Sequence, residues 1–78
     1  MAESTVADVR RILAEVLELD PGAVAAEAST ASLEAWDSIA HLNLILALEQ
    51  ELGVAIPPEE MADLTSVAAL AARIDELR

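Results

Sequence analysis

The chain of 78 residues contains no cysteine, lysine, tyrosine or phenylalanine, and Trp36 is its only tryptophan. Without cysteine, neither a disulfide bond nor a metal site with thiolate ligands can form. No apolar run approaches the roughly 20 residues that cross a bilayer, and the first residues lack the basic and apolar regions of a signal peptide. These absences predict a soluble, cytoplasmic protein.

Basic residues are also scarce, because only four arginines accompany 15 acidic residues, which gives a formal net charge of −11. A field of this sign repels polyphosphate backbones and anionic lipid surfaces, so neither nucleic acid nor a membrane is an expected partner. It would steer a basic protein partner, although acidity can also serve solubility alone. The chain is 55% hydrophobic, which excludes disorder, and its length predicts a single domain over residues 1–78.

Apolar residues recur at helical spacing in three long segments, and no segment alternates like a strand. A first helix is expected over residues 4–19, with Thr5 and Asp8 as a capping pair and Asp20-Pro21-Gly22 as its stop. A long loop should follow over residues 21–36, and loops of this length in small domains are often functional. The apolar stripe of the first helix is Val6, Val9, Leu13 and Val16. The expected core anchors of the loop are Val24, Leu33 and Trp36.

A second helix is expected over residues 38–52, ending at Gly53, which tolerates a left-handed backbone. Its large apolar residues are Ile39, Leu42, Leu44, Ile45, Leu46, Leu48 and Leu52. These are too many for one narrow stripe, so the helix is either buried around most of its circumference or presents apolar surface to a partner. Those expected in the core include Leu44, Leu46 and Leu48.

Two further helices complete the expected fold. A short helix should span residues 58–63, because Pro58 suits a first helical position and Glu59 and Glu60 suit a first turn. The last helix should span residues 66–77, with Thr65 as its N-cap. Its buried stripe is Val67, Leu70, Ile74 and Leu77. The predicted fold is all-α: a small four-helix bundle of three longer helices and one short helix, with a long loop between the first and second helices.

Trp36-Asp37-Ser38-Ile39 places a serine hydroxyl where the second helix begins. Aspartate and serine are both common helix caps, because their oxygens accept hydrogen bonds from unpaired backbone N–H groups. A hydroxyl at a helix start is also a good attachment point for a phosphodiester, whose charge the N–H groups and the helix dipole stabilise. Taken alone, the Asp37-Ser38 pair leaves both interpretations open.

The wider run from Trp36 to Gly53, an aspartate-serine-aliphatic triplet followed by an apolar helix ending near glutamates and a glycine, resembles the acyl carrier protein family. The resemblance extends over almost the whole chain. It implies that Ser38 receives 4′-phosphopantetheine from coenzyme A, and that Asp37 assists the phosphopantetheinyl transferase that catalyses this modification. The thiol of the attached arm then holds an acyl group as a thioester, so the protein is a carrier and not an enzyme.

The same resemblance implies docking of partner enzymes, such as acyltransferases, synthetases or ketosynthases, on the second helix of a monomer. His41 is expected on the exposed side of this helix. The docking candidates are Ile39, His41, Asn43, Glu49 and Glu51.

A departure from the family pattern indicates which biosynthetic pathway the carrier serves. Carriers of bacterial fatty acid synthesis usually have acidic residues early in this helix, where Ala40 and Asn43 stand here. This favours a discrete carrier in polyketide assembly or other specialised metabolism. A carrier of aminoacyl, peptidyl or glyceryl cargo is an alternative, although peptidyl carriers more often have glycines ahead of the serine.

Three other kinds of function have less support from the residues. An unmodified helical module could use the apolar second helix to bind another protein. A hydrolase would need Asp37, Ser38 and His41 to form a triad, but all three crowd one helix start without a G-x-S-x-G elbow. No ligand spacing of the EF-hand kind is present, so no metal site is expected.

Overall fold

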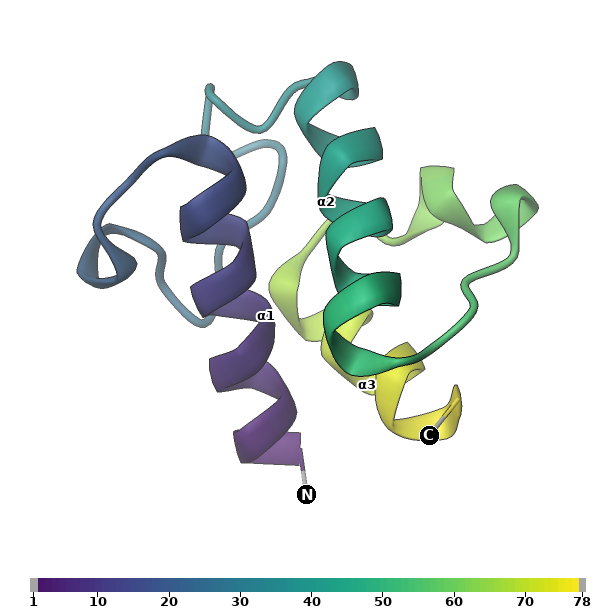
Figure 1. The fold of residues 1–78 in the computed structure, drawn as a ribbon. Coiled ribbons are helices and arrows are strands. Elements are labelled where there is room, and N and C mark those ends of the chain that lie inside the picture. Colours follow the sequence, from purple (N-terminus) through teal and green to yellow (C-terminus); the bar gives the residue numbers. More distant parts are fainter. Residues whose placement is uncertain (1, 78) are drawn as a thin grey trace.

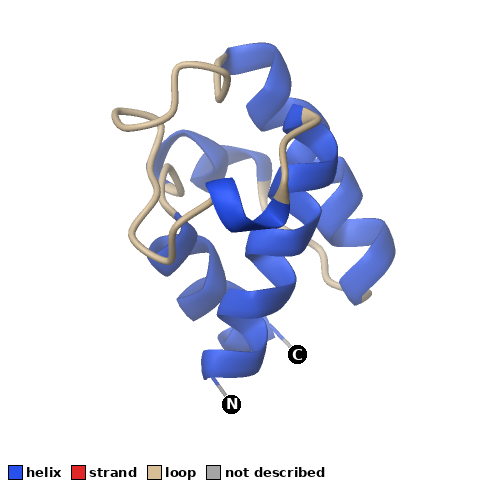
Figure 2. Cartoon of the chain, turned by 90° about the vertical axis from the view of Figure 1, so that its left-hand side faces the viewer, coloured by secondary structure: helices blue, strands red, loops and turns tan. Residues whose placement is uncertain are grey.

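The computed structural model describes residues 2–77, and the side chains of residues 5–77. Its elements follow in the order α1 (Ala2–Leu17), η1 (Pro21–Ala23), α2 (Ser38–Leu52), η2 (Pro58–Asp63) and α3 (Val67–Leu77), where η marks a 3-10 helix. Figure 2 shows helices joined by loops, with no strand among the described residues. The predicted all-α fold is therefore confirmed, and η1 is an additional short turn of helix within the predicted loop.

The core forms where α1 lies against both α2 and α3 (Figure 1). Each of the three α-helices contributes aliphatic side chains with no exposed surface, as expected when amphipathic helices bury their apolar faces together. These side chains are Val9, Ile12 and Leu13 in α1, Leu44 and Leu48 in α2, and Val67, Leu70 and Ile74 in α3. No helix in the described part of the chain has the length and hydropathy needed to span a bilayer.

The first helix differs from its prediction at both ends. It already includes Ala2 and ends at Leu17. Thr5 lies inside the helix, fully buried, and its hydroxyl donates a hydrogen bond to the carboxylate of Asp75 in α3. The predicted capping pair of Thr5 and Asp8 was therefore wrong, because a contact 70 residues away occupies the threonine. Glu18, with a φ of 56°, turns the chain to the left-handed region and ends α1 before the proline.

The long loop is anchored as predicted. Two of its anchors are buried and the third is half-buried against the core: Val24, Trp36 and Leu33, respectively. The loop is also tied to the start of α3, because the Thr30 N–H donates to the Thr65 carbonyl at 3.0 Å and the Val67 N–H donates to the Ala28 carbonyl at 2.9 Å. These bonds hold the part of the loop that leads to Ser38 against the last helix.

The second helix occupies the predicted residues and ends at Gly53, which has a left-handed φ of 65°. Its buried side chains are Leu44, Ile45 and Leu48. Its large exposed side chains are Ile39 (74% exposed), Leu42 (49%) and Leu46 (50%). The helix therefore presents apolar surface, and the prediction that Leu46 belongs to the core was wrong.

The two C-terminal helices are close to their predictions. The short helix η2 has the predicted bounds, and α3 begins one residue later than predicted. Ser66 rather than Thr65 caps α3, since the Ser66 hydroxyl accepts a hydrogen bond from the Ala69 N–H at 3.1 Å. Thr65 precedes the cap and uses its carbonyl to bind the loop.

Candidate functional site

At the start of α2, one residue caps the helix and the next offers a free hydroxyl, whereas the sequence alone did not show which residue is the cap. Asp37 is the N-cap, and its carboxylate accepts a hydrogen bond from the Ala40 N–H at 2.9 Å. Ser38 is the first helical residue, its side chain is exposed, and none of residues 5–77 hydrogen-bonds to its hydroxyl. Because Asp37 supplies the cap, the Ser38 hydroxyl is free for a covalent bond.

A surface depression of about 390 Å³ lies beside Ser38. The end of the loop, the first turn of α2, η2 and the approach to α3 form its walls, and η2 lies to one side of α2 in Figure 1. Its lining residues are Thr30, Trp36, Asp37, Ser38, His41, Ala62 and Thr65. Because the depression is open to solvent, a group bonded to Ser38 can both rest beside the helix and extend away from the protein.

His41 is half-buried and bonded on both sides of its ring. Its Nδ1 accepts a hydrogen bond from Trp36 Nε1 at 3.0 Å, and its Nε2 donates to the Met61 carbonyl at 2.8 Å. The prediction that His41 lies on the exposed side of the helix was therefore wrong. No triad forms either, because Asp37 caps the helix and both ring nitrogens of His41 are used elsewhere.

The two acids predicted to face partners have partners within the chain. Glu49 is half-buried, and its Oε2 accepts a hydrogen bond from the Ile56 N–H at 2.9 Å, which holds the turn that follows α2. Glu51 accepts a hydrogen bond from Arg11 Nη1 at 3.2 Å. The C-terminal end of α2 is therefore fastened to the rest of the fold.

The exposed face of α2 carries a different kind of surface, the apolar strip of Ile39, Leu42 and Leu46. These residues are spaced three and four positions apart and so share one helix face. Asn43 is exposed on the same helix, and the segment from Ser38 to Ala47 contains no acidic residue, lysine or arginine. The high number of large apolar residues in this helix was the sequence evidence that could have identified Leu42 and Leu46.

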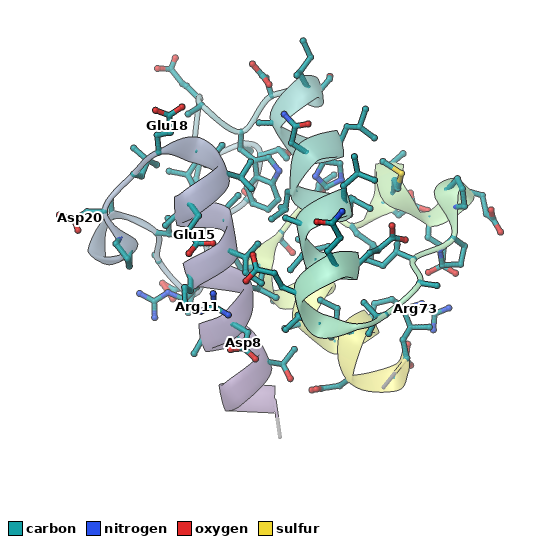
Figure 3. All side chains as sticks on the ribbon, in the orientation of Figure 1. Asp8, Arg11, Glu15, Glu18, Asp20 and Arg73 are labelled. Atoms are coloured by element: carbon teal, nitrogen blue, oxygen red, sulfur yellow. The ribbon has the colours of Figure 1, made fainter. Side chains whose placement is uncertain are left out.

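Arg11 lies among carboxylates on the exposed side of α1. It contacts Asp8 at 3.7 Å, Glu15 at 3.9 Å and Glu51 at 3.2 Å, and Figure 3 shows Asp8, Arg11 and Glu15 along α1. The hydrogen bond to Glu51 and the neighbouring negative charges raise the pKa of Arg11. This cluster connects α1 to the C-terminal end of α2.

Arg73 fastens η2 to α3 in a similar way. Its Nε and Nη2 donate to the two oxygens of Glu60 at 2.6 and 3.0 Å, and its Nη1 donates to Glu76 at 3.1 Å. The hydrogen bonds from Arg73 lower the pKa of Glu60, with a further Coulomb contribution of the same sign. The ion pair connects η2, which forms one wall of the depression, to α3. Across the described side chains, no group of three or more metal-ligating residues is brought together.

The structure is a small helical fold with an exposed serine at the start of α2. A family model described as the phosphopantetheine attachment site matches residues 7–74. The chain therefore belongs to the acyl carrier protein family, whose members carry acyl groups on covalently bound 4′-phosphopantetheine and are not enzymes.

Three relatives illustrate the similarity, and each is called an acyl carrier protein. The relative from Thermosynechococcus vestitus is 46% identical over 59 residues, which cover 76% of this chain and 73% of that protein. The relative from Campylobacter curvus is 36% identical over 70 residues, covering 90% and 91%. The relative from Helicobacter pylori strain G27 is 32% identical over 69 residues, covering 88% of each.

Proposed function

We propose that Ser38 is the residue that carries the phosphopantetheine arm. The observation that supports this most strongly is the division of tasks at the start of α2, where Asp37 caps the helix and leaves the exposed Ser38 hydroxyl without a hydrogen bond from residues 5–77. A serine that only capped the helix would use its oxygen for a backbone N–H group. In the modification, the Ser38 oxygen forms a bond to phosphorus, the hydroxyl proton is lost and the nucleotide half of coenzyme A leaves.

The residues around Ser38 suit a phosphodiester. The first N–H groups of a helix lack intrahelical partners, and the positive end of the helix dipole favours a negative charge there. Asp37 keeps the helix start in place through Ala40. When bound, the arm supplies a terminal thiol that holds an acyl group as a thioester, and its tether raises the local concentration of that group at a docked enzyme.

Intact-protein mass spectrometry tests this assignment after incubation with coenzyme A and a broad-specificity phosphopantetheinyl transferase. We expect one phosphopantetheine on the wild type and none on Ser38→Ala. The matched control is Ser32→Ala, which removes a hydroxyl of the loop that is bonded to the Ser29 backbone, and this variant should be loaded like the wild type. Loading of Ser38→Ala would overturn the assignment. An absence of loading from every variant, with several transferases, would instead favour the unmodified interaction module.

The proposed pathway is polyketide or other specialised metabolism. Its support is the uncharged first half of α2, where Ala40 and Asn43 occupy positions that are usually acidic in carriers of bacterial fatty acid synthesis. We expect a malonyltransferase of bacterial fatty acid synthesis to load the modified chain less efficiently than it loads a carrier of bacterial fatty acid synthesis. Ala40→Glu with Asn43→Glu should narrow that difference, and Glu59→Gln serves as a control outside α2. Equal efficiency of both wild-type carriers would contradict this pathway, and loading by aminoacyl or glyceryl synthetases would favour the alternative cargos.

Partner enzymes are proposed to dock on the apolar strip beside Ser38 through an apolar surface of their own. The strip adjoins Ser38, and each of its three residues is about half exposed or more. Asn43 supplies a neutral polar group beside it, whereas Glu49, Glu51 and His41 already have intramolecular bonds. Apolar docking depends little on salt, because no charges meet at the interface. Leu46→Ala should raise the KM for a partner enzyme, and Glu51→Gln should leave it unchanged.

The remaining parts of the proposal concern the molecule as a whole. A single domain over residues 1–78, acting as a cytoplasmic monomer, suits a carrier whose arm visits several enzymes in turn. Analytical ultracentrifugation of the modified protein tests the monomer, and a concentration-dependent dimer that covers the apolar strip would contradict it.

A further inference from the structure

The hydrogen bonds of His41 specify the charge state of its ring. The indole N–H of Trp36 can only donate, so His41 Nδ1 must accept and cannot carry a proton. The carbonyl oxygen of Met61 can only accept, so Nε2 must carry one. The imidazole is therefore neutral and has its proton on Nε2.

We propose that neutral His41 is a positioning residue for the modification site, and that its protonation releases Trp36 but not Met61. In the neutral form, the ring joins the end of the loop to α2 and α2 to η2, which are three walls of the depression beside Ser38. This inference rests on the proposed function only where it identifies Ser38 as the modified residue.

Protonation would break the bond to Trp36 and keep the bond to Met61 because it changes the number of donors on the ring. A protonated imidazole has two N–H donors and no acceptor. At Nδ1 a second N–H would face the Trp36 indole N–H across the present 3.0 Å, and the bond would be lost. At Nε2 the donor to Met61 is unchanged. Trp36 is only 2% exposed, so its indole N–H must move to find water or another acceptor.

Movement of Trp36 would reach the modification site directly. Trp36 is followed immediately by Asp37, which caps α2, and by Ser38. Trp36 is also hydrogen-bonded by its backbone N–H to the Leu33 carbonyl within the loop. The release is therefore expected to alter the chain that presents the serine hydroxyl, while η2 remains bonded to α2.

Other titratable groups lie on the elements that surround the ring. The carboxylates on the surrounding elements are Glu34 and Asp37 on the side of the loop, and Glu59, Glu60 and Asp63 on η2. Carboxylates titrate mostly below about pH 5, whereas histidines change charge between about pH 5 and 8. His41 is the only histidine in the chain, and Trp36 is its only tryptophan, so each gives a single side-chain signal.

The test is a nuclear magnetic resonance titration of the unmodified protein from pH 8 to pH 5. It follows the Trp36 indole N–H, the imidazole C–H signals of His41 and the backbone amides of η2. We expect the indole signal to move toward that of a free indole with the same midpoint as the imidazole signals, while the η2 amides move much less. An indole signal that stays in place while the imidazole titrates would overturn the proposal, as would an imidazole that stays neutral to pH 5.

The matched variant is His41→Gln, whose side chain keeps a neutral acceptor and donor but cannot gain a proton in this range. Its indole signal should not respond to pH, and an equal response would show that another group causes the change. At pH 8, the variant should regain more of the wild-type transferase kcat/KM than His41→Leu, which offers neither bond; equal losses would contradict a positioning role. The wild-type titration requires no variant, and because no arm is attached, its failure is distinct from a failure of Ser38 loading.

Discussion

The two ends of α2 differ in what they leave available to other molecules. At the N-terminal end, the Ser38 hydroxyl lacks a hydrogen bond from residues 5–77 and the neighbouring apolar strip is exposed. At the C-terminal end, Glu49 binds the Ile56 N–H, Glu51 binds Arg11, and Gly53 closes the helix. One helix thus combines a fastened end with an open one, so the proposed attachment at Ser38 and the proposed docking would leave the contacts of the fastened end intact.

The largest expected effect comes from the buried side of the fastened end. Leu48 has no exposed surface, and Leu48→Ala should lower the free energy of unfolding by about 2–5 kcal/mol, as is typical when a buried leucine is truncated. Leu46→Ala, two residues away on the half-exposed face, should cost less than about 1 kcal/mol. Urea denaturation of both variants measures the difference. Equal losses would mean that Leu46 is not available for docking.

The next largest effect on stability comes from the backbone at Gly53, where α2 ends. Gly53 has a φ of 65°, which residues with a Cβ adopt at a cost of about 1–2 kcal/mol. Gly53→Ala should therefore lower the free energy of unfolding by about this amount in urea denaturation. Gly22→Ala is the matched control, because a Cβ at either glycine would meet no atom within 4 Å and only Gly53 has a positive φ. A similar loss in both variants would contradict the backbone explanation.

A smaller effect on stability distinguishes the helix cap, Asp37, from the free hydroxyl of Ser38 at the N-terminal end of α2. Asp37→Ala removes the helix cap and should cost about 0.5–2 kcal/mol in thermal unfolding experiments. Ser38→Ala removes a hydroxyl without a hydrogen bond from residues 5–77 and should change stability by less than about 0.5 kcal/mol. A larger loss from Ser38→Ala than from Asp37→Ala would mean that the serine is the cap, and would remove the main support for Ser38 as the attachment residue.

The sequence predicted best the features that neighbouring residues determine. The helix over residues 38–52 was recognised because its aspartate-serine start and its terminal Gly53 are local features. The helix over residues 58–63 was recognised because a proline and two glutamates suit a first turn. The free hydroxyl of Ser38 could not be predicted, since Asp37 and Ser38 are equally suitable caps.

The features that were missed depend on residues distant in the sequence. The spacing of Thr5 and Asp8 fits a capping pair, and only the packing of α1 against α3 brings Asp75 to the threonine. His41 was predicted on the exposed side of the second helix, and only the fold brings the Met61 carbonyl to its ring. Such contacts have no periodic pattern in the sequence, so local rules cannot find them.

The smallest expected effect lies outside α2, in the ion pair that fastens η2. Arg73 lowers the pKa of Glu60 below its ordinary value of 4.5, so the unfolded chain takes up a proton at higher pH than the folded chain does. The stability from this pair is therefore present above pH 4.5 and is lost as the pH falls through the lowered pKa. Both side chains are about one-third exposed, so the effect is modest.

Thermal unfolding of the wild type and Glu60→Gln from pH 7 to pH 3 tests this sign. The wild type should have the higher Tm at pH 7, and the difference should shrink as the pH falls below 4.5. Comparison with the variant is necessary because protonating other carboxylates of a chain with a net charge of −11 also relieves repulsion. Glu59→Gln, at an exposed neighbouring position, should not lower the Tm at pH 7. If the Tm difference for Glu60→Gln stays constant with pH, the Arg73 pair does not stabilise η2 through charge, and the wall of the depression is held by packing alone.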